Sequence, residues 1–178
     1  KHEIDTGNLI FQERVEIGPN MTAGELHDQL MYTGADLLVK TVEAMAVGDY
    51  PLQDQGGLLA GREPKHAPKI FKEDMKVDWS LGVDAIFNHI RGLSPFPTAW
   101  TEFRNKKNGE VVSLKIFETE RIVKDHGKEV GLSTDNKTYL DVLVKGGVIR
   151  IKELQLSGKK RMKTEEFLRG FHIEDYSL

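Results

Sequence analysis

Short strand-like runs alternate with turn signals throughout the second half of the chain, and this pattern limits the possible folds more than any other feature. The runs are Thr98–Phe103, Val111–Ile122, Glu129–Leu132, Thr138–Val144 and Val148–Leu156. The turn signals between them are Asn108–Gly109, His126–Gly127, Asp135–Asn136 and Gly146–Gly147. Five short strands joined by tight turns predict a small β-barrel, similar to the OB-fold.

Two helical segments flank this predicted barrel. Apolar residues follow the i, i+3, i+4, i+7 rule at Val83, Ile86, Phe87 and Ile90. Ser80 is the candidate N-cap of this helix, and Gly92 is the candidate stop. A short helix is predicted at Thr164–Gly170. The first helix should lie with its apolar side on the barrel core.

The first 50 residues have a different pattern. Asn8–Ile17 alternates apolar and polar residues, as a half-buried strand does, and a capping box at Thr22–Glu25 begins a predicted helix over residues 23–47. One strand and one helix cannot bury both of their faces. Residues 1–50 are therefore expected to be the edge of a larger α/β domain. Prolines, glycines and loss of apolar periodicity predict a linker at residues 51–78.

Composition excludes several classes of site. The chain has no cysteine, and its six histidines show no pair at metal-binding spacing, so no metal site is expected. No apolar run approaches the roughly 20 residues of a membrane span. We therefore expect no membrane contact, and we expect a cytoplasmic location. No feature indicates an obligate protein partner.

Charge is distributed unevenly, although the net charge is only -3. Residues 1–58 carry three basic side chains against ten acidic ones, whereas residues 145–169 carry eight against three. The densest cluster is Lys159, Lys160 and Arg161, which follows Gly158 and could contact phosphates. Lys69, Lys72 and Arg91 are further candidates for contact with RNA. The alternatives are solvated surface charges and, for Arg91, capping of helix carbonyls. Trp79 and Trp100 could stack on bases, but their setting favours the core.

Seven collinear blocks give the chain a resemblance to the methionyl-tRNA formyltransferase family from Asp5 to Gly170. They are Asp5–Ile10, Thr22–Asp28 with Gly34–Leu38, Ala67–Ile70, Val77–Trp79, Ile90–Pro95, Leu154–Met162 and Phe167–Gly170. Each block is weak by itself, but their shared order is specific. The first triplet, Asp5–Gly7, also occurs in aspartic proteases, but the residues around it do not fit those enzymes.

The resemblance implies an α+β fold in three parts. Residues 1–50 would be the end of a Rossmann-like formyltransferase catalytic domain, represented by a strand and a helix. Residues 51–78 would be a linker, and residues 79–178 a C-terminal OB-like domain that binds tRNA. The implied reaction transfers a formyl group from 10-formyltetrahydrofolate to the amino group of methionine on initiator tRNA.

Within that reaction, the resemblance gives Asp5 a catalytic role. The asparagine and histidine that act on the formyl group lie upstream in the family, outside this chain, and Asp5 would tune that histidine and hold a water. The chain alone is therefore expected to be inactive. Two alternatives stay open: a related formyltransferase that acts on a nucleotide sugar, and a non-enzymatic barrel that binds single-stranded nucleic acid.

Overall fold

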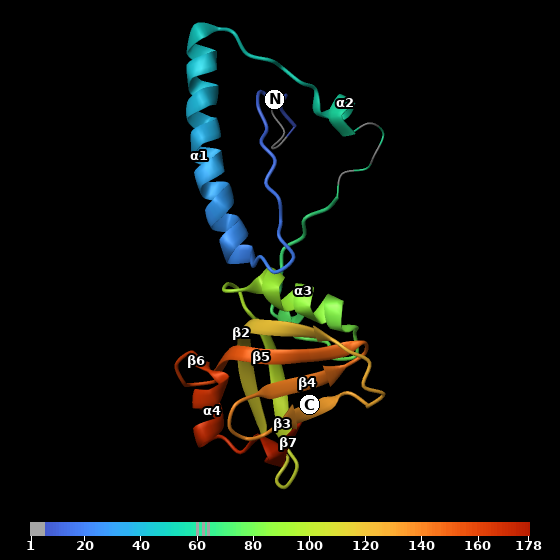
Figure 1. Cartoon of the computed structure of the whole chain (residues 1–178). Helices are drawn as coiled ribbons and strands as arrows, with labels where there is room; N and C mark the ends of the chain where they lie inside the picture. Colours follow the sequence, from blue (N-terminus) through green and yellow to red (C-terminus); the bar gives the residue numbers. More distant parts are fainter. Residues whose placement is uncertain (1–5, 60, 62, 64) are drawn as a thin grey trace. The chain divides into compact units, whose positions relative to one another are not determined.

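The computed structural model describes residues 6–59, 61, 63 and 65–178, and it divides the chain into two compact units (Figure 1). The first unit contains residues 1–19 and 25–69, and the second contains residues 20–24 and 70–178. Asp5 lies outside the described residues.

The second unit is built on one antiparallel sheet that is nearly closed, like a barrel. Its strands are β1 (Ala99–Asn105), β2 (Val111–Val123), β3 (Gly131–Thr134), β4 (Leu140–Val144), β5 (Gly147–Leu156), β6 (Met162–Lys163) and β7 (Tyr176–Ser177). The order across the sheet is β3-β4-β5-β2-β1-β7, and β6 pairs with β5. β1 to β5 correspond to the five strands that the sequence predicts. β3 begins two residues later than the predicted run.

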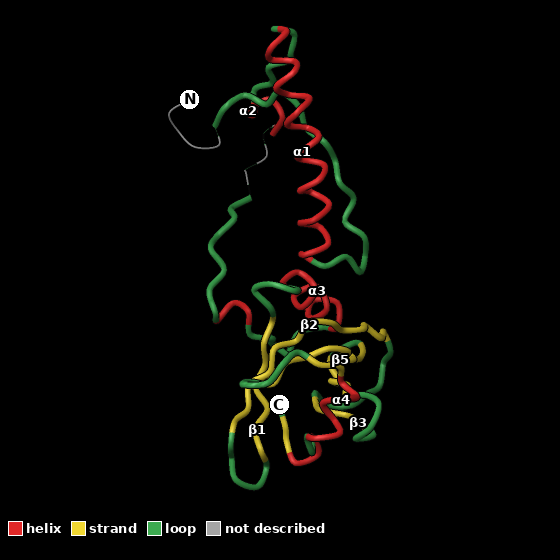
Figure 2. Tube along the Cα trace, turned by 90° about the vertical axis from the view of Figure 1, so that its left-hand side faces the viewer, coloured by secondary structure: helices red, strands yellow, loops and turns green. Residues whose placement is uncertain are grey.

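Helices α3 (Val83–Leu93) and α4 (Thr164–Gly170) complete the core of this unit. α3 packs on β2 and β5, and Figure 2 shows it alongside β2. The predicted apolar side of α3 is buried, with Ile86 and Ile90 each only 1% exposed. α4 has the predicted bounds and buries Phe167 and Leu168. These helices cover apolar strand residues, which gives the unit a continuous core.

The start of α3 differs from the sequence prediction. Gly82, not Ser80, is the N-cap, and the amide of Val83 donates to the carbonyl of Lys145 at 2.9 Å. Ser80 belongs to a local turn instead, in which both its amide and its hydroxyl donate to the Asp78 carboxylate, at 3.0 and 2.6 Å. A short turn at Asp78–Ser80 thus delays the helix, and the helix also continues past Gly92 to Leu93. A single-turn η1 (Glu73–Met75) precedes it, and η2 (Ile173–Asp175) follows α4.

The first unit contains helix α1 (Ala23–Val47) and the short helix α2 (Gln55–Leu59); the first two residues of α1 belong to the second unit. α1 has the predicted bounds. It ends where Gly48 adopts a positive φ of 80° and its amide donates to the carbonyl of Ala44 at 3.0 Å. No residue of α1 is buried. This helix therefore forms without covering its apolar side chains, which include Leu30, Leu38, Val42 and Met45.

The predicted strand at Asn8–Ile17 is wrong. In the described part of this unit, only Leu9 pairs, in a single bridge with Gln53 whose two N–H···O distances are both 2.9 Å. A strand needs a neighbour that satisfies each of its outward amides and carbonyls. Gln53 supplies that pairing for one residue, so the alternating pattern does not become a strand.

Candidate functional site

A tightly bonded turn holds the basic run that the sequence singles out. Gly158 adopts a positive φ of 75°, which turns the chain after β5. The amide of Lys159 donates to the carbonyl of Leu156 at 2.9 Å, and the side-chain amide of Gln155 donates to the carbonyl of Lys159 at 2.7 Å. The backbone of Lys159 is therefore fixed at both its donor and its acceptor.

The three basic side chains of this turn have different surroundings. Lys160 Nζ lies 3.3 Å from Glu166 Oε1, and both side chains are largely exposed. Arg161 pairs with the Glu153 carboxylate and lies over the Phe117 ring, 4.3 Å from its centroid. The Lys159 ammonium has no ion pair among the described residues. Lys159 is thus the member of the run whose charge is most available to a ligand.

Lys72 lies beside Trp100 on β1. The indole N–H of Trp100 donates to the carbonyl of Lys72 at 2.9 Å, and the Lys72 ammonium lies 5.6 Å from the ring centroid. Lys76 Nζ lies 5.0 Å from the same centroid and 2.6 Å from a Glu102 oxygen. Trp100 is half-buried, unlike Trp79, which belongs to the core as the sequence favours. Trp100 is therefore an aromatic platform with two cations over it.

Strand register brings these two groups to one face of the sheet. Trp100 lies directly opposite Lys115 on β2, and Lys115 lies directly opposite Gln155 on β5. Residues opposite each other in antiparallel strands point to the same side. We call this surface the basic face and define it by Lys72, Lys76, Trp100, Lys115, Gln155 and Lys159.

Lys115 was missed by the sequence reasoning. It is exposed, and no ion pair or hydrogen bond involves its ammonium within the part of the chain that the structure describes. The sequence shows Lys115 only as a single lysine at an outward position of the predicted strand. Only the register, however, shows that it lies between Trp100 and the turn of Lys159.

Arg91 has a local structural task. Its Nε donates to Asn88 Oδ1 at 2.7 Å, and its Nη1 donates to the carbonyl of Met21 at 2.6 Å. Arg91 therefore holds the segment 20–24 on α3. Lys69 is exposed and belongs to the first unit, so it is described apart from the basic face.

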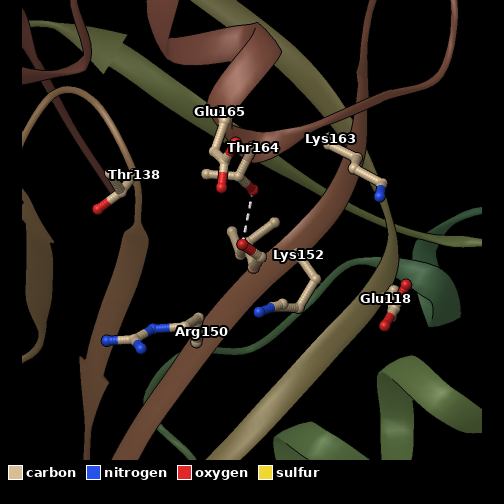
Figure 3. Close-up of a pocket in the computed structure, with 8 residues that line it drawn as sticks. Glu118, Thr138, Arg150, Lys152, Lys163, Thr164 and Glu165 are labelled. Carbon is tan, nitrogen blue, oxygen red and sulfur yellow. Dashed lines mark hydrogen bonds between the residues drawn. The ribbon is translucent and has the colours of Figure 1, made fainter.

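A pocket of about 210 Å³ lies between β5 and the start of α4 (Figure 3). Its lining includes three cations (Arg150, Lys152 and Lys163) and two carboxylates (Glu118 and Glu165). Arg150 is already held by Asp141 through two 2.8 Å hydrogen bonds, and this pairing raises the pKa of Arg150. The Thr164 hydroxyl donates to the carbonyl of Ile151 at 2.6 Å. The nearly balanced charge of this lining favours neither an anion nor a cation.

Metal and membrane sites can be assessed for the described residues only. Among them, no group of three or more His, Cys, Asp or Glu side chains is placed to hold a metal ion. Within the same part of the chain, no helix is long and apolar enough to cross a membrane.

Comparisons with known proteins identify the family. The model of the formyl transferase C-terminal domain matches residues 69–172. A methionyl-tRNA formyltransferase of Phocaeicola vulgatus is 46% identical over 177 residues, which cover 98% of this chain and 54% of that protein. One of Porphyromonas gingivalis is 40% identical and is covered to the same 54%. The chain thus spans about half the length of these curated relatives.

Solved structures share the fold at low sequence identity. HypX from Aquifex aeolicus matches 98% of this chain and 30% of its own, with a TM-score of 0.64 and 16% identity. HypX in complex with tetrahydrofolic acid matches with a TM-score of 0.63 and 15% identity, over 100% of this chain and 32% of its own. The domain match extends over more than half of the residues and places the chain in the formyl transferase family, whose C-terminal domain it carries at residues 69–172.

Proposed function

We propose that this chain is the C-terminal part of a methionyl-tRNA formyltransferase. The complete protein would transfer a formyl group from 10-formyltetrahydrofolate to the amino group of methionine on initiator tRNA. The observation that carries this proposal is the 46% identity to a methionyl-tRNA formyltransferase over 98% of the chain. Such a protein would act in translation initiation, in the cytoplasm.

The chain's own part in this function is to hold the tRNA. The OB-like domain at residues 79–178 would bind through the basic face, to which the linker at residues 51–78 adds Lys72 and Lys76. Residues 1–50 would be the end of the Rossmann-like catalytic domain. Lys115 and Lys159 support this role because both ammonium groups are exposed and lack ion pairs among the described residues. Phosphate neutralisation by such side chains releases counterions and gives affinity without sequence specificity.

The other predicted contacts would contribute to binding in different ways. Lys160 and Arg161 would exchange their carboxylate partners, Glu166 and Glu153, for phosphates. Lys72 would act within the basic face, beside Trp100. Lys69 would be a separate contact, in the first unit. Arg91 would contribute by holding residues 20–24 on α3, with RNA contact as its second role.

Catalysis would require residues that this chain does not contain. The family resemblance gives Asp5 the role of tuning a histidine and holding a water, and it places that histidine and its asparagine partner upstream. We therefore expect the chain alone to lack formyl transfer. Turnover of methionyl-tRNA within about tenfold of a complete enzyme, or roughly 1.4 kcal/mol of barrier, would contradict this assignment.

Salt-dependent tRNA binding tests the proposal directly. Initiator tRNA is titrated against the wild-type chain and a variant with alanine at Lys159, Lys160 and Arg161, at several salt concentrations. If each side chain contacts a phosphate, the log–log slope should flatten by roughly two to three units. The matched control replaces Lys124, Lys128 and Lys137, which are exposed elsewhere in the same unit. Equal slopes for the two triple variants would contradict RNA binding through this turn.

A further inference from the structure

Phe96 is an exposed aromatic side chain that the core does not use. It is 85% exposed, more than any other large hydrophobic side chain that the structure describes. It lies between Pro95 and Pro97 in the loop that joins α3 to β1. Burial therefore gives no reason for an aromatic ring at this position.

The loop that carries Phe96 is fixed on both sides. Ser94 is 4% exposed, and its hydroxyl donates to the carbonyl of Phe117 at 2.6 Å. Thr98 is 3% exposed; its amide donates to the carbonyl of Leu93 at 2.9 Å, and its hydroxyl donates to the carbonyl of Pro95 at 2.5 Å. The ring is thus presented to solvent from a backbone that is already ordered, which lowers the entropy cost of binding.

The same anchor connects the Phe96 loop to Phe117, whose ring carries a cation of the proposed RNA site. The Ser94 hydroxyl is hydrogen-bonded to the backbone carbonyl of Phe117, and the Arg161 guanidinium lies 4.3 Å from the centroid of the Phe117 ring. Phe96 is two residues from Ser94, so their Cα atoms are at most about 7 Å apart. An extended ligand such as RNA that contacts Arg161 could therefore also reach the exposed ring.

The chemistry of this surface favours a nucleobase over a protein. A stable protein interface buries about 800 Å² on each partner, and much of its centre is apolar. Phe96 offers one ring between two prolines, with a basic turn nearby. A nucleobase needs only a free aromatic face, and its phosphate needs a nearby cation. Single exposed apolar residues are common on surfaces, so the fixed loop and the neighbouring cation are what distinguish Phe96.

We propose that Phe96 stacks on an unpaired base of the bound RNA, next to phosphates held by the turn of Lys159–Arg161. This inference rests on the proposed function and adds a contact that depends on base exposure. Stacking is insensitive to salt and requires an unpaired base, whereas the lysine contacts depend on salt and accept paired RNA. The two kinds of contact can therefore be separated by experiment.

The test measures binding of fluorescein-labelled initiator tRNA and of a fully paired RNA duplex to wild type, Phe96→Leu and Phe96→Trp. We expect Phe96→Leu to weaken tRNA binding about tenfold, with an unchanged salt slope, because one stacked base contributes about this much. Phe96→Trp should bind tRNA as wild type does. The matched control is Tyr32→Leu, which removes an aromatic ring that is 69% exposed on α1. Duplex affinity should be the same for all four proteins.

Unfolding in urea first establishes that the variants fold as wild type does. Equal tRNA affinity of Phe96→Leu and wild type would overturn the inference, as would an equal loss on the duplex, because a duplex offers no unpaired base. In either case, salt-dependent binding by the wild type would leave the proposed function intact. If the wild-type chain binds no tRNA at any salt concentration, both the proposed function and the stacking inference are contradicted.

Discussion

The side-chain amide of Gln155 lies 2.7 Å from the backbone carbonyl of Lys159 and donates a hydrogen bond to it. Gln155 also faces Lys115 across the β2–β5 pair. The same side chain therefore ties the basic turn to the row of residues that contains Lys115 and Trp100. Lys115 and Lys159 are brought to one surface although 44 positions separate them in the sequence.

The first prediction concerns Lys115. We expect Lys115→Ala to flatten the log–log salt dependence of tRNA binding by about one unit, as Lys159→Ala should. Each substitution removes from the basic face one cation that has no ion pair among the described residues. Lys128→Ala is the control, since Lys128 is exposed in the loop between β2 and β3. Titrations of initiator tRNA at several salt concentrations give the slopes. A slope for Lys115→Ala that equals the Lys128→Ala slope would exclude Lys115 from the contact.

Local patterns predict much of this fold. The apolar period of α3, the bounds of α1 and α4, and the five main strands can all be read from neighbouring residues. Contacts between residues that are distant in the sequence cannot be predicted in this way. The run Lys159–Arg161 looks like three equivalent charges, but folding brings Glu153 to Arg161 and Glu166 to Lys160 and leaves Lys159 unpaired among the described residues. The sequence alone therefore does not show which of these charges is available to a ligand.

The wrong predictions of a strand at Asn8–Ile17 and of an N-cap at Ser80 have a related cause. Asn8–Ile17 has the alternation of a strand, but a strand also needs a partner, and the described residues supply one only at Leu9. Ser80 has the chemistry of an N-cap, but the helix begins only after Gly82, where the amide of Val83 donates to the carbonyl of Lys145. In both cases the residue type is right, and its partner decides the structure.

The second prediction tests a buried hydrogen bond beneath the basic face. The indole N–H of Trp79 donates to the Thr101 hydroxyl at 2.8 Å, and Thr101 is only 2% exposed. Thr101→Val keeps the shape but removes the acceptor, so the free energy of unfolding should fall by about 1–3 kcal/mol. Urea denaturation measures it. In a Trp79→Phe background the same substitution should cost much less, and an equal cost in both backgrounds would show that the hydrogen bond is not responsible.

The third prediction compares two glycines of α1. A Cβ added at Gly24 would lie 2.4 Å from Pro95 Cδ, whereas at Gly34 it would meet nothing within 4 Å. Gly24→Ala should therefore displace residues 20–24 from the loop and break the hydrogen bond of the Gly24 N–H to the carbonyl of Ser94, which measures 2.9 Å. Gly34→Ala should instead stabilise the exposed helix by about 0.5–1 kcal/mol.

Amide hydrogen exchange distinguishes these outcomes. The amide of residue 24 should lose at least tenfold in protection in Gly24→Ala and should be unchanged in Gly34→Ala, where protection should rise in the middle of α1. Undiminished protection of residue 24 in Gly24→Ala would mean that the loop accommodates the methyl group.

The last prediction concerns acid stability and begins with the turn between β3 and β4. Asp135 Oδ1 accepts hydrogen bonds from the amides of Lys137 and Thr138 at 2.9 and 2.7 Å, and Oδ2 accepts the Thr138 hydroxyl at 2.5 Å. These hydrogen bonds hold the pKa of Asp135 well below its ordinary value, and the bond from the Thr138 hydroxyl has the largest effect. Folding therefore favours the ionised carboxylate.

The sign of the pH dependence follows from this lowered pKa. The stability that Asp135 contributes is present above its unfolded pKa of about 3.9 and is lost as pH falls toward its lower folded pKa. We expect the free energy of unfolding of the wild type to fall between about pH 5 and pH 2 more steeply than that of Asp135→Asn, which should be less stable at pH 7. Urea denaturation across this pH range gives the slopes. If Asp135→Asn has the same slope as the wild type, the Asp135 carboxylate is not the group that links stability to pH.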